Sequence, residues 1–163
     1  MSDFHKLLKK INGDSRLSTL MKVCCYLVTA LSVAVFVFLM YHAFCRSLTE
    51  GIGYAMTLAI PFLAVSIVRR LINAPRPYEL YDFFDTPPKK TKGESFPSRH
   101  AFSIFAIGTL CLFVQPLLGG ITLLLGALMC VCRVLLGMHF VRDVLCGALV
   151  GIISSVIGAL ILI

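Results

Sequence analysis

The chain has 163 residues, of which 58% are hydrophobic and 14% are charged, and its formal net charge is +7. This length favours a single domain, 1–163, and the hydrophobic excess excludes an ordinary soluble protein. The basic residues lie beside apolar runs and no recognised nucleic-acid motif accompanies them, so we expect a bilayer with anionic lipids as the partner and no nucleic acid.

The first segment, 1–20, is expected to lie in the membrane interface. Its apolar residues recur with helical spacing and lysines lie between them, which predicts a short amphipathic helix formed around Phe4, Leu7, Leu8 and Ile11. The apolar run that follows is too long for the core of a signal peptide and shows no evident cleavage site. We therefore expect it to stay as a first membrane span, at about 23–45.

Four further apolar runs predict spans at about 51–70, 98–115, 117–136 and 144–163. The third and fourth come from one uncharged stretch that Gln115 and Pro116 divide, and Ser98 is a good N-cap for the third. The fold class is therefore an all-α integral membrane protein, a bundle of about five transmembrane helices. In the last span, small residues recur every four positions and predict close helix packing, within the protein or in a homo-oligomer: Gly147, Gly151, Ser155 and Ala159.

The long polar segment 73–97 holds most of the prolines and several aromatic residues, and it predicts a loop. With five spans, this loop and the stretch from Arg133 to Asp143 face the same side of the membrane. Of the 15 Lys and Arg residues, all except Arg46 lie on that side. The positive-inside rule places this face in the cytoplasm.

Two histidines and a carboxylate interrupt the apolar sequence on this face. His139 and Asp143 are four residues apart, so a helical turn brings them to one face, where a carboxylate fixes the imidazole tautomer. His139 could then act as a nucleophile and His100 as a general acid. Taken alone, each of these residues is more typical of a polar group at a membrane interface.

The same face carries groups suited to an anion. Arg69, Arg76 and Arg133 can supply several donors to phosphate oxygens. Ser98 and the backbone N–H groups at the start of the third span add further donors. The seven cysteines form no C-x-x-C pair and no zinc spacing, so they are interpreted as small packing residues.

Three motifs in this region resemble those of the type 2 phosphatidic acid phosphatase (PAP2) superfamily, commonly written K-x6-R-P, P-S-G-H and S-R-x5-H-x3-D. They stand here as Arg69-x6-Arg76-Pro77, Pro97-Ser98-Arg99-His100 and Cys132-Arg133-x5-His139-x3-Asp143. The resemblance covers about half the chain, from Arg69 to Gly147. Each motif alone is weak, but the three together match in order and internal spacing.

The resemblance implies a metal-independent, cofactor-free lipid phosphatase of the small bacterial type, located in the cell membrane. His139 would be the nucleophile that forms a phosphohistidine, Asp143 its orienting partner, and His100 the acid that protonates the leaving group and then activates water. The implied phosphate ligands are Arg69, Arg76, Ser98, Arg99 through its backbone N–H, and Arg133. The implied substrate is a lipid phosphomonoester or diphosphate, such as phosphatidic acid, phosphatidylglycerol phosphate or a polyprenyl diphosphate.

Three positions depart from the family pattern: Arg69 replaces lysine, Arg99 replaces glycine and Cys132 replaces serine. The better known bacterial members are usually described with six spans, and many have their site on the opposite membrane face.

Two functions other than lipid phosphatase are consistent with the same sequence. A phosphotransferase would use the same phosphohistidine with a different acceptor, and a noncatalytic binding or scaffold protein would keep only the fold.

Overall fold

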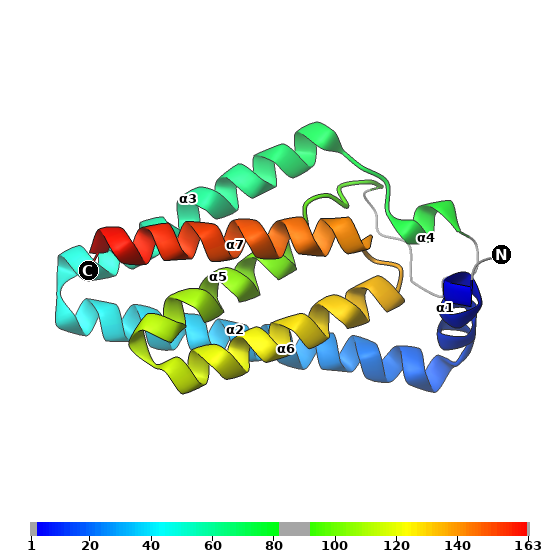
Figure 1. Cartoon of the computed structure of the whole chain (residues 1–163), viewed down its shortest axis with the longest axis horizontal. Coiled ribbons are helices and arrows are strands. Elements are labelled where there is room, and N and C mark those ends of the chain that lie inside the picture. Colours follow the sequence, from blue (N-terminus) through cyan, green and yellow to red (C-terminus); the bar gives the residue numbers. More distant parts are fainter. Residues whose placement is uncertain (1–2, 82–91, 163) are drawn as a thin grey trace.

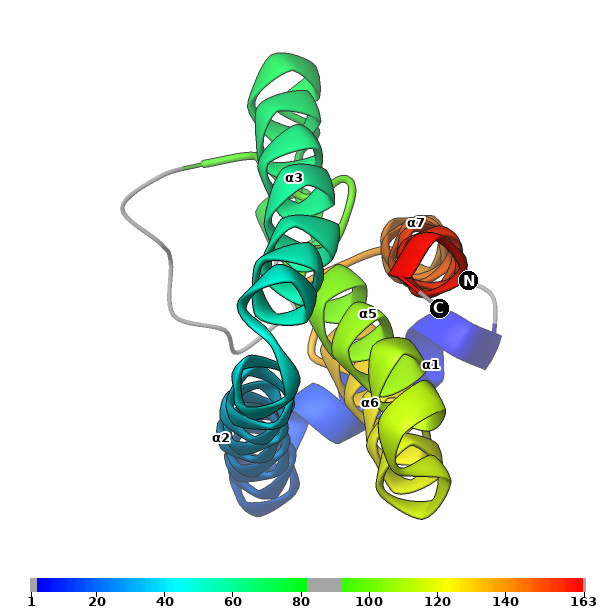
Figure 2. The same ribbon diagram turned by 90° about the vertical axis from the view of Figure 1, so that its left-hand side faces the viewer.

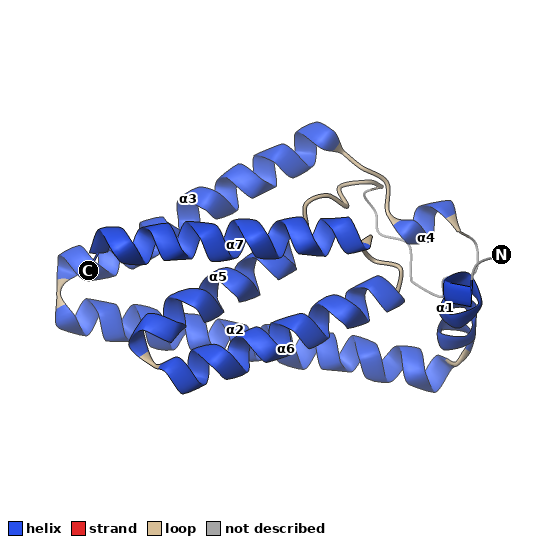
Figure 3. Cartoon of the chain, viewed as in Figure 1, coloured by secondary structure: helices blue, strands red, loops and turns tan. Residues whose placement is uncertain are grey.

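The computed structural model describes residues 3–81 and 92–162, with side chains from Leu8 onward. The described part is helical and contains no strand (Figure 3). Its elements are α1 (Asp3–Gly13), α2 (Ser15–Arg46), α3 (Leu48–Ile72), α4 (Pro77–Leu80), α5 (Arg99–Val114), α6 (Pro116–Leu135) and α7 (Val141–Leu162). The predicted all-α fold class is confirmed. Residues 82–91 of the predicted loop, including Lys89 and Lys90, lie outside the described residues.

The shortest of the five long helices, α5, forms the centre of the bundle. It packs against α2, α3, α6 and α7, which surround it in Figure 2. Within the described residues, four segments are long and apolar enough to cross a membrane: α2, the segment Leu48–Leu80 that contains α3, α6 and α7. With 16 residues, α5 is about 24 Å long. The third predicted span is therefore a short helix that its neighbours enclose.

Local signals fix the helix ends. Asp14 caps α2 by accepting hydrogen bonds from the backbone of Arg16 and Leu17, so this helix begins at Ser15 and extends well before the apolar run at residue 23. Ser98 caps α5 as predicted, because its Oγ accepts from Ala101 N at 3.4 Å. Pro116 occupies the first turn of α6, at the predicted break.

The N-terminal helix packs against the bundle at the end that carries the motifs. It contacts α2 and α6, with Leu8 buried and Lys9 and Lys10 exposed, as an amphipathic helix requires. Asn12 is buried and donates through Nδ2 to Leu135 O at 2.8 Å. This bond ties α1 to the last residue of α6. The side chains of Phe4 and Leu7 lie outside the described part.

The small-residue stripe of α7 packs within the protein. A Cβ on Gly147 or Gly151 would collide with the backbone of α5, and Ser155 Oγ donates to Ala106 O at 2.9 Å. The stripe lets α7 approach α5 closely enough for Asp143 and Ser98 to meet at the end of the bundle. This packing explains the four-residue spacing without a second copy of the chain.

We expect Gly151→Ala to destabilise the protein, because its Cβ would meet the carbonyl oxygen of Phe102 and the backbone nitrogen of Ala106. The backbone of α5 has no room to move, so the cost should be about 1–3 kcal/mol. Thermal unfolding in detergent measures it. The control is Gly120→Ala, where nothing lies within 4 Å of the added Cβ and helix propensity favours alanine by about 1 kcal/mol. Equal effects of the two substitutions would contradict this packing.

The motif residues gather at one end of the bundle. Figure 1 shows the start of α2, the end of α3, α4, and the connection between α6 and α7 at the right-hand end. The turn between α2 and α3, with Arg46, lies at the opposite end. The segments that carry the three motifs therefore meet, although the chain crosses the bundle between them.

Candidate active site

His139 lies in the turn between α6 and α7, and Asp143 follows in the first turn of α7. Gly137, with φ of +67°, allows the chain to turn sharply after α6. Both His139 and Asp143 are almost completely buried, at 1% and 0% exposed. His139 Nδ1 is 3.7 Å from Asp143 Oδ2, which is within ion-pair range but too long for a hydrogen bond.

Ser95 lies between these two side chains, and the sequence analysis did not identify it. Its Oγ donates to Asp143 Oδ2 and lies 3.4 Å from His139 Nδ1. Asp143 Oδ2 also accepts from Phe140 N at 2.9 Å. The one signal in the sequence is that Ser95 stands just before the second motif, in a segment that was interpreted only as a loop.

The pKa of His139 is lowered from its ordinary value of 6.5 to about 4. Burial is the main cause, because it disfavours the charged ring. The nearby carboxylate of Asp143 opposes this shift, and the positive charges of Arg133, Arg76 and Arg69 add to it. At neutral pH the imidazole is therefore neutral. Nδ1 is the ring nitrogen that faces Ser95 and Asp143, so these two side chains leave Nε2 unengaged.

This lowered pKa predicts the acid limb of the pH profile. A nucleophilic His139 loses its lone pair only when pH falls through its folded-state pKa, so kcat/KM should hold down to about pH 5 and fall near pH 4. The profile must be corrected for the second ionisation of the substrate phosphate, with a pKa near 6. A corrected acid limb at pH 6.5 or above would contradict the neutral, buried histidine.

Arg69, in the last turn of α3, is 4% exposed and holds the segment before α5. One guanidinium nitrogen, Nη1, donates to Pro97 O at 3.0 Å and Ser95 O at 3.4 Å, and Nε lies 3.6 Å from Glu94 Oε2. A lysine has no such planar fork. The arginine that departs from the family pattern therefore suits this loop.

Arg76, which precedes α4, joins the same segment to the turn that carries His139. Its Nε donates to Gly93 O at 3.0 Å, Nη2 to Glu94 O at 3.4 Å, and Nη1 to Met138 O at 3.5 Å. It is 3% exposed. Arg69 and Arg76 together fix the backbone from Gly93 to Pro97, and with it the hydroxyl of Ser95.

Ser98 connects the second motif to the third. It is completely buried, and its N–H donates to Asp143 O at 2.9 Å. Arg99 opens α5 with ordinary helical backbone, so the conformational freedom of glycine is not required there. Cys132 packs beside Cys25 of α2 in an apolar cluster. The substitutions at positions 99 and 132 are thus accommodated locally.

A cavity of about 280 Å³ opens beside these residues. It is lined by Arg76, His100, Arg133, Leu136 and Met138, together with four residues of α2, Lys22, Cys25, Tyr26 and Thr29. These lining residues include three permanent cations and no carboxylate, so the cavity favours an anion. Arg133 Nε is buried and has no hydrogen-bond partner among the described residues. It is a donor that a bound anion would satisfy.

The structure thus brings together Arg76, Arg133 and His100 of the predicted set around one cavity. Arg69 and Ser98 lie behind it, holding the backbone, and Arg99 lines a neighbouring cavity that also includes His100. Lys22 is a further cation that no motif indicated, because it precedes the first apolar run. Within the described part of the chain, no three His, Cys, Asp or Glu side chains are grouped to hold a metal ion.

Comparisons with known proteins identify a family and two similar folds. A family model described as the PAP2 superfamily matches residues 50–162. The fold is similar to the crystal structure of Aquifex aeolicus LpxE, with a TM-score of 0.70 and 25% identity, covering 94% of this chain and 93% of that one. It is also similar to the first transmembrane PAP2-type phosphatidylglycerolphosphate phosphatase from Bacillus subtilis, with a TM-score of 0.69 and 21% identity, covering 97% and 83%. A search of curated protein sequences returned no match.

Proposed function

The chain belongs to the PAP2 superfamily, and we propose that it is a membrane phosphatase that hydrolyses a lipid phosphomonoester or diphosphate through a phosphohistidine. The observation that carries this proposal is the buried neutral His139, held beside Asp143 and directly after Met138, which lines a cavity together with Arg76, Arg133 and Lys22. A neutral imidazole supplies the nucleophile, and the cations supply the charge that a transferring phosphoryl group needs.

In the first step, His139 Nε2 attacks phosphorus and forms a P–N bond while the P–O bond to the lipid breaks. His100, which lines the cavity, donates a proton to the departing oxygen. In the second step, His100 takes a proton from water as its oxygen attacks phosphorus. The P–N bond breaks, inorganic phosphate leaves, and His139 is neutral again. Arg76 and Arg133 neutralise the phosphate oxygens throughout.

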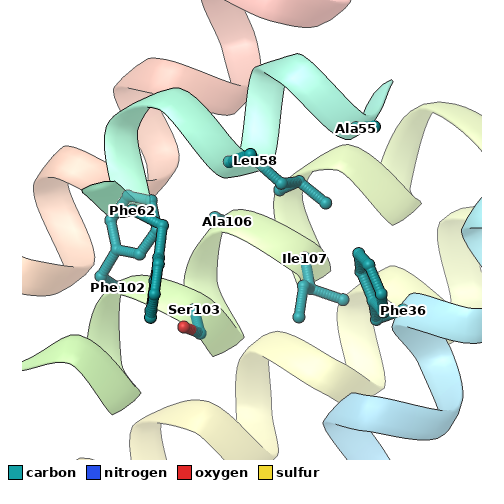
Figure 4. A pocket seen from close by; sticks show the side chains of 9 residues that line it. Phe36, Ala55, Leu58, Phe62, Phe102, Ser103, Ala106 and Ile107 are labelled. Carbon is teal, nitrogen blue, oxygen red and sulfur yellow. The ribbon is translucent and has the colours of Figure 1, made fainter. Parts of the chain in front are cut away.

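The apolar surroundings support a lipid substrate. The cavity beside His139 shares Thr29 and His100 with a second cavity of about 380 Å³. That cavity shares Phe36 and Phe62 with a third, of about 320 Å³, between α2, α3 and α5. Figure 4 shows this third cavity, walled by aromatic and aliphatic side chains. A lipid whose phosphate lies in the cavity with Arg76 and Arg133 would therefore have neighbouring apolar cavities for its hydrocarbon chain.

Phosphate release from a panel of lipid phosphates by purified protein tests the proposal. We expect release from at least one phosphomonoester or diphosphate by the native protein, unaffected by EDTA, because cationic side chains rather than a metal bind the phosphate. Adding an alcohol acceptor distinguishes a phosphotransferase, which would form a new ester. No release on any lipid would favour the noncatalytic scaffold, and inhibition by EDTA that magnesium reverses would contradict the metal-free mechanism.

We propose that the motif end faces the cytoplasm, because every lysine and arginine within residues 3–81 and 92–162, except Arg46, lies towards it. Cys45, at the opposite end, is the one exposed cysteine of the seven. In a variant that keeps only this cysteine, a membrane-impermeant maleimide should label intact cells. A matched variant with its single thiol introduced by Lys92→Cys, on the motif side, should react only after permeabilisation. The reverse pattern would place the site outside.

A further inference from the structure

We propose that Ser95 is a positioning residue that couples His139 to Asp143 and sets the reactive tautomer of the histidine. This inference rests on the proposed function, since it concerns the same nucleophile. His139 Nδ1 and Asp143 Oδ2 are 3.7 Å apart. Ser95 Oγ donates a hydrogen bond to that carboxylate oxygen and lies closer to His139 Nδ1, at 3.4 Å. The serine hydroxyl is thus the intermediate group.

The direction of each hydrogen bond follows from the chemistry of the three groups. A carboxylate only accepts, so the single hydroxyl proton of Ser95 must point to Asp143. The oxygen of Ser95 then has only lone pairs to offer to His139 Nδ1. A hydrogen bond between the two atoms therefore requires Nδ1 to be the donor. His139 therefore carries its proton on Nδ1. The lone pair on Nε2 is left to attack phosphorus.

The backbone holds the Ser95 hydroxyl in place. Ser95 is completely buried, its N–H donates to Ala74 O at 2.8 Å, and its carbonyl accepts from Arg69. Arg76 fixes the two preceding carbonyls. This is a second use for the arginines of the first motif, in addition to their charge, because they position a hydroxyl that acts on the nucleophile.

The same contacts stabilise the intermediate. When Nε2 bonds to phosphorus, the ring becomes cationic and Nδ1–H becomes a stronger donor. Ser95 accepts that bond, and its hydroxyl is in turn polarised by the buried carboxylate of Asp143. Without the hydroxyl, His139 Nδ1 has no partner within hydrogen-bond distance among the residues that the structure describes, since Asp143 is too far away.

The tautomer of His139 tests the inference without any substrate. Nitrogen-15 NMR of histidine-labelled protein in detergent distinguishes the two neutral tautomers, and His139→Ala identifies the resonance. We expect the Nδ1–H form in the native protein and a mixture of both forms in Ser95→Ala. A native His139 that carries its proton on Nε2, or a tautomer unchanged in Ser95→Ala, would overturn the proposal. This result stands even if no lipid is hydrolysed, so it is separable from the proposed function.

Kinetics give a second test. Ser95→Ala should lower kcat by about 10- to 100-fold, by analogy with the groups that orient metal-bound histidines, with KM little changed because Ser95 does not line the cavity. If Ser95 acts through Asp143, adding Ser95→Ala to Asp143→Asn should cost less than about 3-fold more. If the loss of kcat in the double variant equals the product of the two single losses, Ser95 and Asp143 act independently, which would contradict the coupling.

Two variants serve as controls in these measurements. Ser154→Ala removes a hydroxyl that donates to Gly151 O within α7, at 3.1 Å, and should keep native kcat and the native His139 tautomer. Ser95→Thr retains a hydroxyl and should restore the Nδ1–H tautomer. A Ser95→Ala protein that turns over at the native rate per folded molecule would show that Ser95 matters only for folding.

Discussion

His139→Ala is expected to lower phosphate release on the preferred lipid by about 10⁴-fold or more, because it removes the group that forms the covalent intermediate. The substitution removes a side chain that is 1% exposed and sits in a turn. Stopped assays of inorganic phosphate, normalised to folded protein by gel filtration, measure the loss.

The matched control is His42→Ala. His42 lies near the far end of α2, against Phe38 and away from the cavity. Its replacement should leave phosphate release at the native rate. If His139→Ala retained a tenth of the native activity or more, His139 would not be the nucleophile, whatever the outcome at His42.

His100→Ala should produce the second largest loss, about 10²- to 10⁴-fold on lipid phosphomonoesters. The reason is that a lipid alkoxide is a poor leaving group that needs a proton, and His100 lines the cavity beside Arg76 and Arg133. An aryl phosphate, whose phenolate leaves unprotonated, needs no acid in the first step. His100→Ala should therefore form the phosphoenzyme rapidly from the aryl substrate and hydrolyse it slowly.

Pre-steady-state mixing of His100→Ala with p-nitrophenyl phosphate measures this difference. We expect a burst of p-nitrophenol equal to the enzyme concentration, followed by slow turnover. The lipid should give no burst. If His100→Ala lost the same factor of turnover on the lipid and on p-nitrophenyl phosphate, with no burst, His100 would contribute to substrate binding and would not be the proton donor.

Local sequence signals predicted the helices and most of their limits. The N-cap at Ser98 and the break at Gln115 were both correct, because each depends on a few adjacent residues. The predicted span at about 23–45 lies within α2, but the helix itself begins earlier, at Ser15, because Asp14 caps it ahead of the hydrophobic run. The small-residue spacing in α7 indicated close packing, but its partner, α5, required the structure.

The sequence predicted which residues belong to the site. It did not predict the contacts that these residues make with one another. Arg76, Arg133 and His100 line one cavity, in keeping with their motifs. The position of Ser95 depends on bonds to residues 26 and 48 positions away in the chain. Such contacts leave no periodic or local signal. The same holds for Lys22, which reaches the cavity only because α2 packs against α5 and α6.

The most direct test of the account is to trap the intermediate. Purified protein mixed with a lipid carrying a labelled phosphate, quenched in alkali within milliseconds and digested, should yield one labelled peptide that contains His139, since phosphohistidine is stable to alkali and labile to acid. His139→Ala should give none. Phosphate release by the native protein with no label on His139, or with label on another residue, would contradict the mechanism.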